Sequence, residues 1–226
     1  MDSLTQIVLG AAVGEVVLGR KVGNKAILWG AIAGTIPDLD VLARSLFDPL
    51  RANELHRGFT HSILFSAAMA PVLAIWLKRH AASLLTVFTL LVALTFVQGA
   101  ENGLVRGILL VVTAGIIVLI FRRRRLPDGG THKEWSWLFW WSLVTHPLLD
   151  CHTTWGTQLF WPLPWKLSWN NIFVVDPLYT VPFMICVGIV MFIRRDNARR
   201  RWVNWFGIGI SSAYMLFTIV CKRIAV

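Results

Sequence analysis

The sequence predicts an all-α polytopic membrane protein with about six to eight membrane-embedded helices. Hydrophobic residues make up 56% of its 226 residues and charged residues only 15%, whereas a soluble domain carries about 25% charged residues. Two uncharged stretches, 81–100 and 202–221, are long enough to cross a bilayer, and several others are nearly so. Such a series indicates one integral-membrane domain over residues 1–226.

Eight apolar segments follow one another along the chain. The second is too short to span a membrane alone, so we expect the first two to form a tight or re-entrant pair covered by protein. Glycines in both segments, including Gly10 and Gly30, permit close helix packing. The segments cover about 4–19, 26–36, 62–78, 81–98, 104–121, 135–150, 178–193 and 202–221.

The distribution of Lys and Arg predicts how the segments are oriented. If the segments alternate across the membrane, one set of connections holds 15 of the 22 basic residues and the other set holds four. Basic connections stay in the cytoplasm, so the second set is predicted to face the periplasm of a bacterium. The basic set comprises 20–25, 78–80, 122–134 and 194–201, and the other comprises 37–61, 99–103 and 151–177.

The net charge of +10 is explained by this topology. The chain has no soluble basic domain and no DNA-reading motif, so no nucleic-acid partner is predicted. Tryptophan is frequent, with twelve copies, and many lie between 135 and 169. This pattern is typical of an interfacial belt, although the same loop could line a lipid-access groove.

An acidic pair follows the second apolar segment. Pro37 is expected to end the helix there, which leaves Asp38 and Asp40 in the next loop. Carboxylates in such a loop could bind a metal ion, or they could cap a helix over 39–47.

Two histidines, His56 and His61, precede the third segment. Five residues apart, they do not share a face of one helix. A turn at Gly58, with Thr60 as the N-cap of the helix, would bring both imidazoles to one ion. Arg57 in the same turn could hold an anionic phosphate or carboxylate.

A second cluster lies at the end of the sixth segment. His146 and Asp150 are four residues apart and therefore share a helical face, and His152 follows just past the helix end. An imidazole inside an apolar segment needs a partner. That partner is either a metal ion or, more simply, a hydrogen bond to Asp150.

Two further carboxylates are candidates for tuning the site or supplying a general base. Asp176 precedes the seventh segment, where a helix N-terminus would also favour it. Glu15 lies in the middle of the first segment, where a carboxylate needs a proton, a metal or a partner.

The predicted topology places the acidic pair, both histidine clusters and Asp176 at the same membrane face. Imidazole and carboxylate are the usual ligands of zinc. We therefore expect one site for divalent metal, with Zn²⁺ as the expected ion. Its predicted ligands are Asp38, Asp40, His56, His61, His146, Asp150 and His152.

Five motifs resemble the YdjM-type family of membrane-bound, metal-dependent hydrolases, some of which are under LexA control. The resemblance implies an inner-membrane location and hydrolysis that depends on a divalent metal, and longer relatives carry a C-terminal soluble region. The His-x3-Asp spacing also looks like that of zinc-dependent phospholipases C and nucleases. The motifs are MDSLTQ (1–6), GTIPDLD (34–40), HRGFTHS (56–62), HPLLDCHTTWG (146–156) and DPLYT (176–180).

These features favour an inner-membrane hydrolase whose metal-bound water cleaves an ester or phosphodiester bond of a lipid-like substrate. Two other functions use the same residues. A metal or proton transporter would need ionisable groups through the membrane, and within the segments only Glu15, Arg106 and His146 are ionisable at depth. A scaffold would hold a purely structural metal in closed four-ligand coordination.

Overall fold

The computed structural model describes residues 1–45, 57–123 and 129–225. Within these ranges the regular elements are helices, apart from one isolated bridge between Thr157 and Leu167. The predicted all-α membrane class is therefore confirmed. The elements are α1 (Ser3–Val22), α2 (Asn24–Thr35), η1 (Pro37–Ser45), η2 (Phe59–His61), α4 (Ile63–Gly99), α5 (Gly103–Arg123), α6 (His132–Asp150), α7 (Pro177–Phe192) and α8 (Ala198–Ala225).

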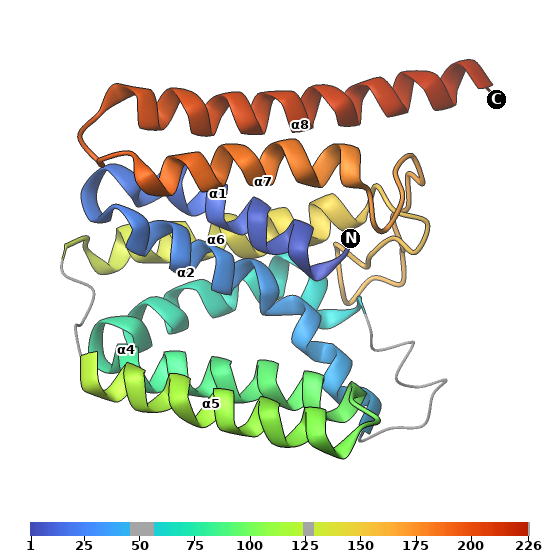
Figure 1. The fold of residues 1–226 in the computed structure, drawn as a ribbon. Coiled ribbons are helices and arrows are strands. Elements are labelled where there is room, and N and C mark those ends of the chain that lie inside the picture. Colours follow the sequence, from blue (N-terminus) through green and yellow to red (C-terminus); the bar gives the residue numbers. More distant parts are fainter. Residues whose placement is uncertain (46–56, 124–128, 226) are drawn as a thin grey trace.

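The helices lie side by side, and their connections gather at two ends of the bundle (Figure 1). One end holds the α1–α2 turn at Gly23, the bend within α4 and the α7–α8 connection. The N-terminus, η1, η2 and the long connection between α6 and α7 lie at the other end. This alternation agrees with the order of connections predicted from the apolar segments.

The third and fourth predicted segments form the single long helix α4, which has 37 residues. His80 has non-helical backbone angles (φ −142°, ψ 47°), and the chain reverses its direction there (Figure 1). The predicted connection at 78–80 is thus a sharp bend rather than an open loop. The second half of α4 runs back toward the end of the bundle that holds η1 and η2.

Fewer helices than predicted can cross a membrane by length and composition. Of the described helices, four qualify: α1, α4, α5 and α8. The helices α2 and α7 have 12 and 16 residues, which is below the about 20 residues that a bilayer requires. They lie within the bundle against longer neighbours.

Glycines bring α1 and α2 into backbone contact, as their composition predicted. A Cβ atom on Gly10 would lie 2.3 Å from the carbonyl oxygen of Gly30, and one on Gly30 would lie 2.2 Å from that of Gly10. Neither position has room for a larger residue. The close contact fixes where α2 ends, and therefore where η1 begins.

Helix α6 contributes several fully buried side chains to the bundle. Trp135, Leu138, Phe139 and Leu143 have no exposed surface or almost none, and they form a core with side chains of α1, α2 and α4. A capping box between Thr131 and Glu134 starts the helix. The rigid packing of α6 sets the depth of the two polar residues in its last turns, His146 and Asp150.

Candidate metal centre

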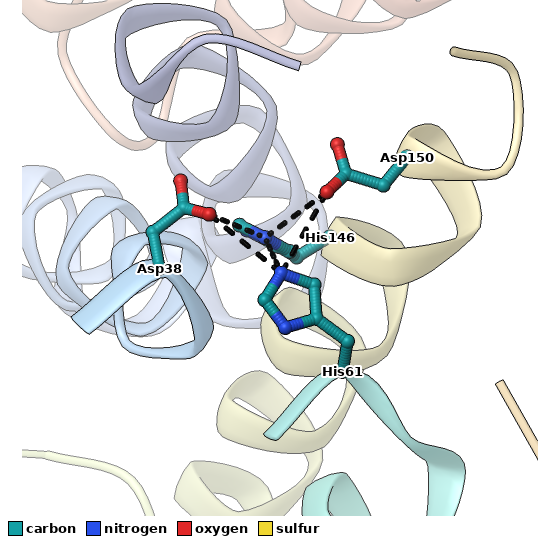
Figure 2. A group of neighbouring side chains, drawn as sticks. All are labelled: Asp38, His61, His146 and Asp150. Carbon is teal, nitrogen blue, oxygen red and sulfur yellow. Dashed lines mark hydrogen bonds and ion pairs between the residues drawn. The ribbon is translucent and has the colours of Figure 1, made fainter. Parts of the chain in front are cut away.

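Four side chains from three separate elements meet at one end of the bundle (Figure 2). They are Asp38 of η1, His61 of η2, and His146 and Asp150 of α6. One ligand atom from each lies within 4.8 Å of all the others. Three of these side chains are fully buried, and that of Asp38 is 19% exposed.

The spacing of these atoms suits a tetrahedral ion. His146 Nε2 lies 3.1 Å from His61 Nε2 and 3.3 Å from Asp38 Oδ1. Asp150 Oδ2 lies 3.6 Å from His61 Nε2 and 3.8 Å from His146 Nε2. Zinc with ligands at 2.0–2.1 Å and tetrahedral angles separates its ligand atoms by about 3.3–3.4 Å. These four separations lie near that value, while the widest in the cluster is within 4.8 Å, so the side chains could hold a zinc ion after they draw together.

Both imidazoles offer Nε2 to the centre of the cluster. His146 Nδ1 lies 2.6 Å from the carbonyl oxygen of Gly34, which can only accept a hydrogen bond, so Nδ1 carries the proton. His61 Nδ1 lies 3.4 Å from Asp40 Oδ2. Contacts of this kind to the second ring nitrogen orient metal-binding histidines and fix their tautomer.

Of the two carboxylate oxygens of Asp150, only one accepts hydrogen bonds. Its Oδ1 accepts hydrogen bonds from Gln6 Nε2, at 3.0 Å, and from the amino group of Met1. Its Oδ2 is buried and accepts no hydrogen bond, although the guanidinium of Arg57 lies 3.6 Å away. A buried carboxylate oxygen without a hydrogen bond costs free energy. A cation at the centre of the cluster would remove that cost.

Electrostatics also favours a cation. Burial raises the pKa of Asp38, but the imidazoles of His146 and His61 outweigh it and hold this pKa below its ordinary range. Burial lowers the pKa of His61, while its contacts with Asp38 and Asp40 outweigh this and leave the pKa raised. The carboxylates thus attract positive charge to the cluster, either as a proton on His61 or as a metal ion.

The acidic pair divides into two roles. Asp38 lies in the cluster, whereas Asp40 lies behind His61 and also accepts a hydrogen bond of 2.9 Å from the hydroxyl of Thr60. Both residues belong to the 3₁₀ helix η1 and not to the predicted loop. Asp40, predicted as a direct ligand, is placed to orient one.

The turn before α4 differs from the prediction in its cap. Ser62, not Thr60, is the N-cap of α4, and its hydroxyl accepts from the backbone N–H of Phe65. His61 therefore precedes the helix in η2. Arg57 is buried and donates to the hydroxyl of Thr153 at 3.0 Å, which places it beside Asp150. His56, the other predicted ligand here, lies outside the described residues.

The structure does not bring His152 into the cluster. Its Nδ1 lies 2.9 Å from Asn171 Oδ1, and its ring packs edge-on against Trp169 with centroids 4.5 Å apart. The group of residues able to hold one metal ion does not include it. His152 follows the end of α6, where the backbone turns toward the connection to α7.

Asp176 and Glu15 also lie outside the cluster. Asp176 is the N-cap of α7, where it accepts from the backbone N–H groups of Leu178 and Tyr179, and it accepts from the hydroxyl of Tyr214. The helix-terminus interpretation thus accounts for its position.

Glu15 forms a buried two-bond ion pair with Arg200 of α8, at 2.6 and 2.7 Å. It lies nine residues beyond Gln6 in α1, which is about 13 Å along the helix. Since Gln6 contacts Asp150, Glu15 is too far from the cluster to exchange a proton with a group bound there. The suggestion that it serves as the base is corrected accordingly.

Gln6 is the polar neighbour that sequence reasoning missed. Its amide donates to Asp150 Oδ1 and, at 3.3 Å, to the carbonyl of His146. The signal was present, because an amide in an apolar helix usually hydrogen-bonds to another helix. No sequence pattern, however, indicates which helix supplies the partner.

We predict that Gln6→Met lowers the affinity for the metal by about 10–100-fold, the usual effect of losing a group that supports a ligand. Asp150 would lose a donor while the volume of the side chain stays similar. A titration against a competing chelator measures the effect, with the matched variant Gln98→Met at an exposed position of α4 as the control. Equal affinities of the two variants would contradict a supporting role for Gln6.

Comparison with known proteins identifies one family. The model of the family described as YdjM inner membrane protein matches residues 1–100 and 103–225. No curated protein and no solved structure shows significant similarity to the chain. The resemblance drawn from the five motifs is thereby confirmed for nearly the whole sequence.

Proposed function

The chain belongs to the YdjM inner membrane protein family, and from its cluster of two histidines and two aspartates we propose that it is a metal-dependent hydrolase of that membrane. The single observation that carries the proposal is the state of Asp150 Oδ2. This oxygen is buried, accepts no hydrogen bond and faces two imidazole nitrogens. Nitrogen and carboxylate ligands at this spacing favour zinc among the common divalent metals.

A zinc ion supplies a hydroxide at neutral pH, because it lowers the pKa of bound water to about 7. The residues of the chain would then position the reactants. Asp38 is the least buried of the four side chains and lines an adjoining hollow, so a substrate would approach from its side. Zinc can expand to five ligands during a reaction, which leaves room for water beside four protein groups.

The position of the cluster supports a lipid-like substrate. The connection between α6 and α7 carries Trp155, Trp165 and Trp169, each at least half exposed, and exposed tryptophans are typical of the membrane interface. The cluster lies at the same end of the bundle. With basic connections in the cytoplasm, this end would face the periplasm, and the scissile ester or phosphodiester bond would lie at headgroup level.

A structural metal is the second candidate function. Four protein ligands could close the coordination sphere, which is typical of structural zinc sites. The transporter alternative has less support, because Glu15, the one carboxylate deep in α1, is neutralised by Arg200.

The test combines metal analysis with turnover. Protein purified in detergent is expected to contain one equivalent of zinc. It is expected to cleave phospholipid in vesicles of phosphatidylethanolamine and phosphatidylglycerol, to lose this activity on chelation and to regain it when zinc is restored. Bound zinc without turnover of either phospholipid would leave the structural metal as the function. Protein that binds no divalent metal at all would refute both.

A further inference from the structure

A hollow opens directly beside the cluster. It has a volume of about 470 Å³ and lies between α1, α2, η1 and the second half of α4. Pockets for small molecules occupy about 300–1,000 Å³. Most of its lining is apolar, and Asp38 is the one charged side chain among the described residues that line it.

The hollow has a polar end and an apolar end. The second half of α4 runs toward the end of the bundle that holds the cluster (Figure 1), so along this helix Phe96 lies closer to that end than Phe88 does, and both line the hollow. Eight residues of α-helix separate these two rings by about 12 Å. Ser3 of α1 lies at the polar end, since its hydroxyl is 3.5 Å from Asp38 Oδ2, and Ile7, one helical turn farther along α1, also lines the hollow. Val92 lies between the ends.

The surroundings of the hollow indicate what it holds. Val87, Leu90 and Leu94 are exposed on the outer side of this half of α4, between 38% and 49%, as expected for side chains that face lipid. The molecules available to an apolar hollow at this depth are the acyl chains of the bilayer. An acyl chain in the hollow would lie along the apolar lining and would place its polar end at Asp38, where the lining is charged.

We propose that this hollow is the subsite for one acyl chain of a membrane phospholipid, and that the carboxyl ester of that chain lies at the Asp38 end. The proposal rests on the proposed hydrolase function and adds the bond that is cleaved. The ester is the first polar group along the lipid from the end of the chain, and the phosphodiester lies farther away. The cluster therefore faces the ester.

The reaction consumes one water. Its oxygen bonds to the ester carbonyl carbon, the bond from that carbon to the glycerol oxygen breaks, and the glycerol oxygen takes a proton. The products are a fatty acid, which ionises in water, and a lysophospholipid. The length of chain accepted would be set by the apolar lining away from Asp38, at Val92 and then Phe88.

The test uses one blocking, one extending and one control variant. Val92→Trp fills the middle of the hollow, Phe88→Ala lengthens it, and Leu94→Trp adds the same indole to the exposed face of the same helix. In phosphatidylethanolamine–phosphatidylglycerol vesicles with chains of graded length, Val92→Trp is expected to lower fatty-acid release about 10-fold or more for long chains. Phe88→Ala is expected to shift the preference to longer chains, and Leu94→Trp is expected to match the wild type.

A second measurement does not depend on turnover. A phospholipid with a photoreactive group within one acyl chain is expected to label residues near Val92 in wild type and in chelator-treated protein, and to label Val92→Trp about 10-fold less. Labelling without hydrolysis would refute the hydrolase function and retain the acyl-chain subsite. Hydrolysis with equal behaviour of Val92→Trp and Leu94→Trp would refute the subsite and retain the function. Release of a phosphorylated headgroup in place of fatty acid would overturn the assignment of the ester.

Discussion

Replacing His146 with alanine is expected to lower the affinity of the protein for zinc by at least about 100-fold, because loss of a direct ligand exceeds the 10–100-fold effect of losing a supporting group. His146 Nε2 is central to the cluster, within 3.8 Å of a ligand atom of His61, Asp38 and Asp150. Zinc content after dialysis, together with titration against a chelator, measures the loss.

The matched control is His152→Ala. Both histidines lie near the end of α6, and both were predicted as ligands, but only His146 belongs to the cluster. His152→Ala is expected to keep the zinc content of the wild type. If the two variants lose zinc equally, the cluster is not the binding site. If neither variant loses zinc, the ion binds elsewhere in the chain.

Replacing Glu15 with alanine is expected to destabilise the protein by about 3–5 kcal/mol, the usual result of leaving one partner of a buried ion pair alone. The side chains of Glu15 and Arg200 are only 2% and 3% exposed, and two hydrogen bonds join them. Arg200 also donates to the carbonyl of Ile193. The pair therefore ties α8 and the α7–α8 connection to α1.

Unfolding by denaturant in detergent micelles, followed by tryptophan fluorescence, measures this effect. The double variant Glu15→Leu with Arg200→Met is expected to regain most of the lost stability, because apolar replacements remove both charges together. Lys21→Ala, which breaks the exposed pair with Glu134, is the control and is expected to change stability little. A single variant as stable as this control would show that the pair does not hold α8 in place.

The features of the site that could be predicted from the sequence are those that depend on local geometry alone. Four-residue spacing on one helix is sufficient to bring His146 and Asp150 together, whatever surrounds them. Alternation of the connections along the apolar segments then correctly grouped Asp38 and His61 at the same end of the bundle, because alternation needs no tertiary information. The glycine-lined contact of α1 with α2 was likewise predicted, from the composition of the first two apolar segments.

The remaining features depended on long-range packing. The sequence alone gives no reason to distinguish Asp38 from Asp40. In the structure, the direction of η1 makes Asp38 a candidate ligand and Asp40 a partner of His61. Like any carboxylate in an apolar helix, Glu15 suggested a functional role. Its partner Arg200 lies 185 residues away in the sequence, so the pair could not be predicted from local spacing. His152 follows the end of α6, so its position is set by the backbone of the connection. Helical periodicity does not apply to that backbone and could not predict the position.

Gly34 shows how closely helix packing and ion binding are joined in this protein. Its missing side chain lets α2 approach α1, since a Cβ atom there would lie 2.6 Å from the carbonyl oxygen of Gln6. Its own carbonyl oxygen accepts a hydrogen bond from His146 Nδ1–H. If an ion occupies the cluster, as proposed, its binding and the close approach of the helices would be linked equilibria, so that each strengthens the other by mass action. Removal of such an ion would then loosen the bundle.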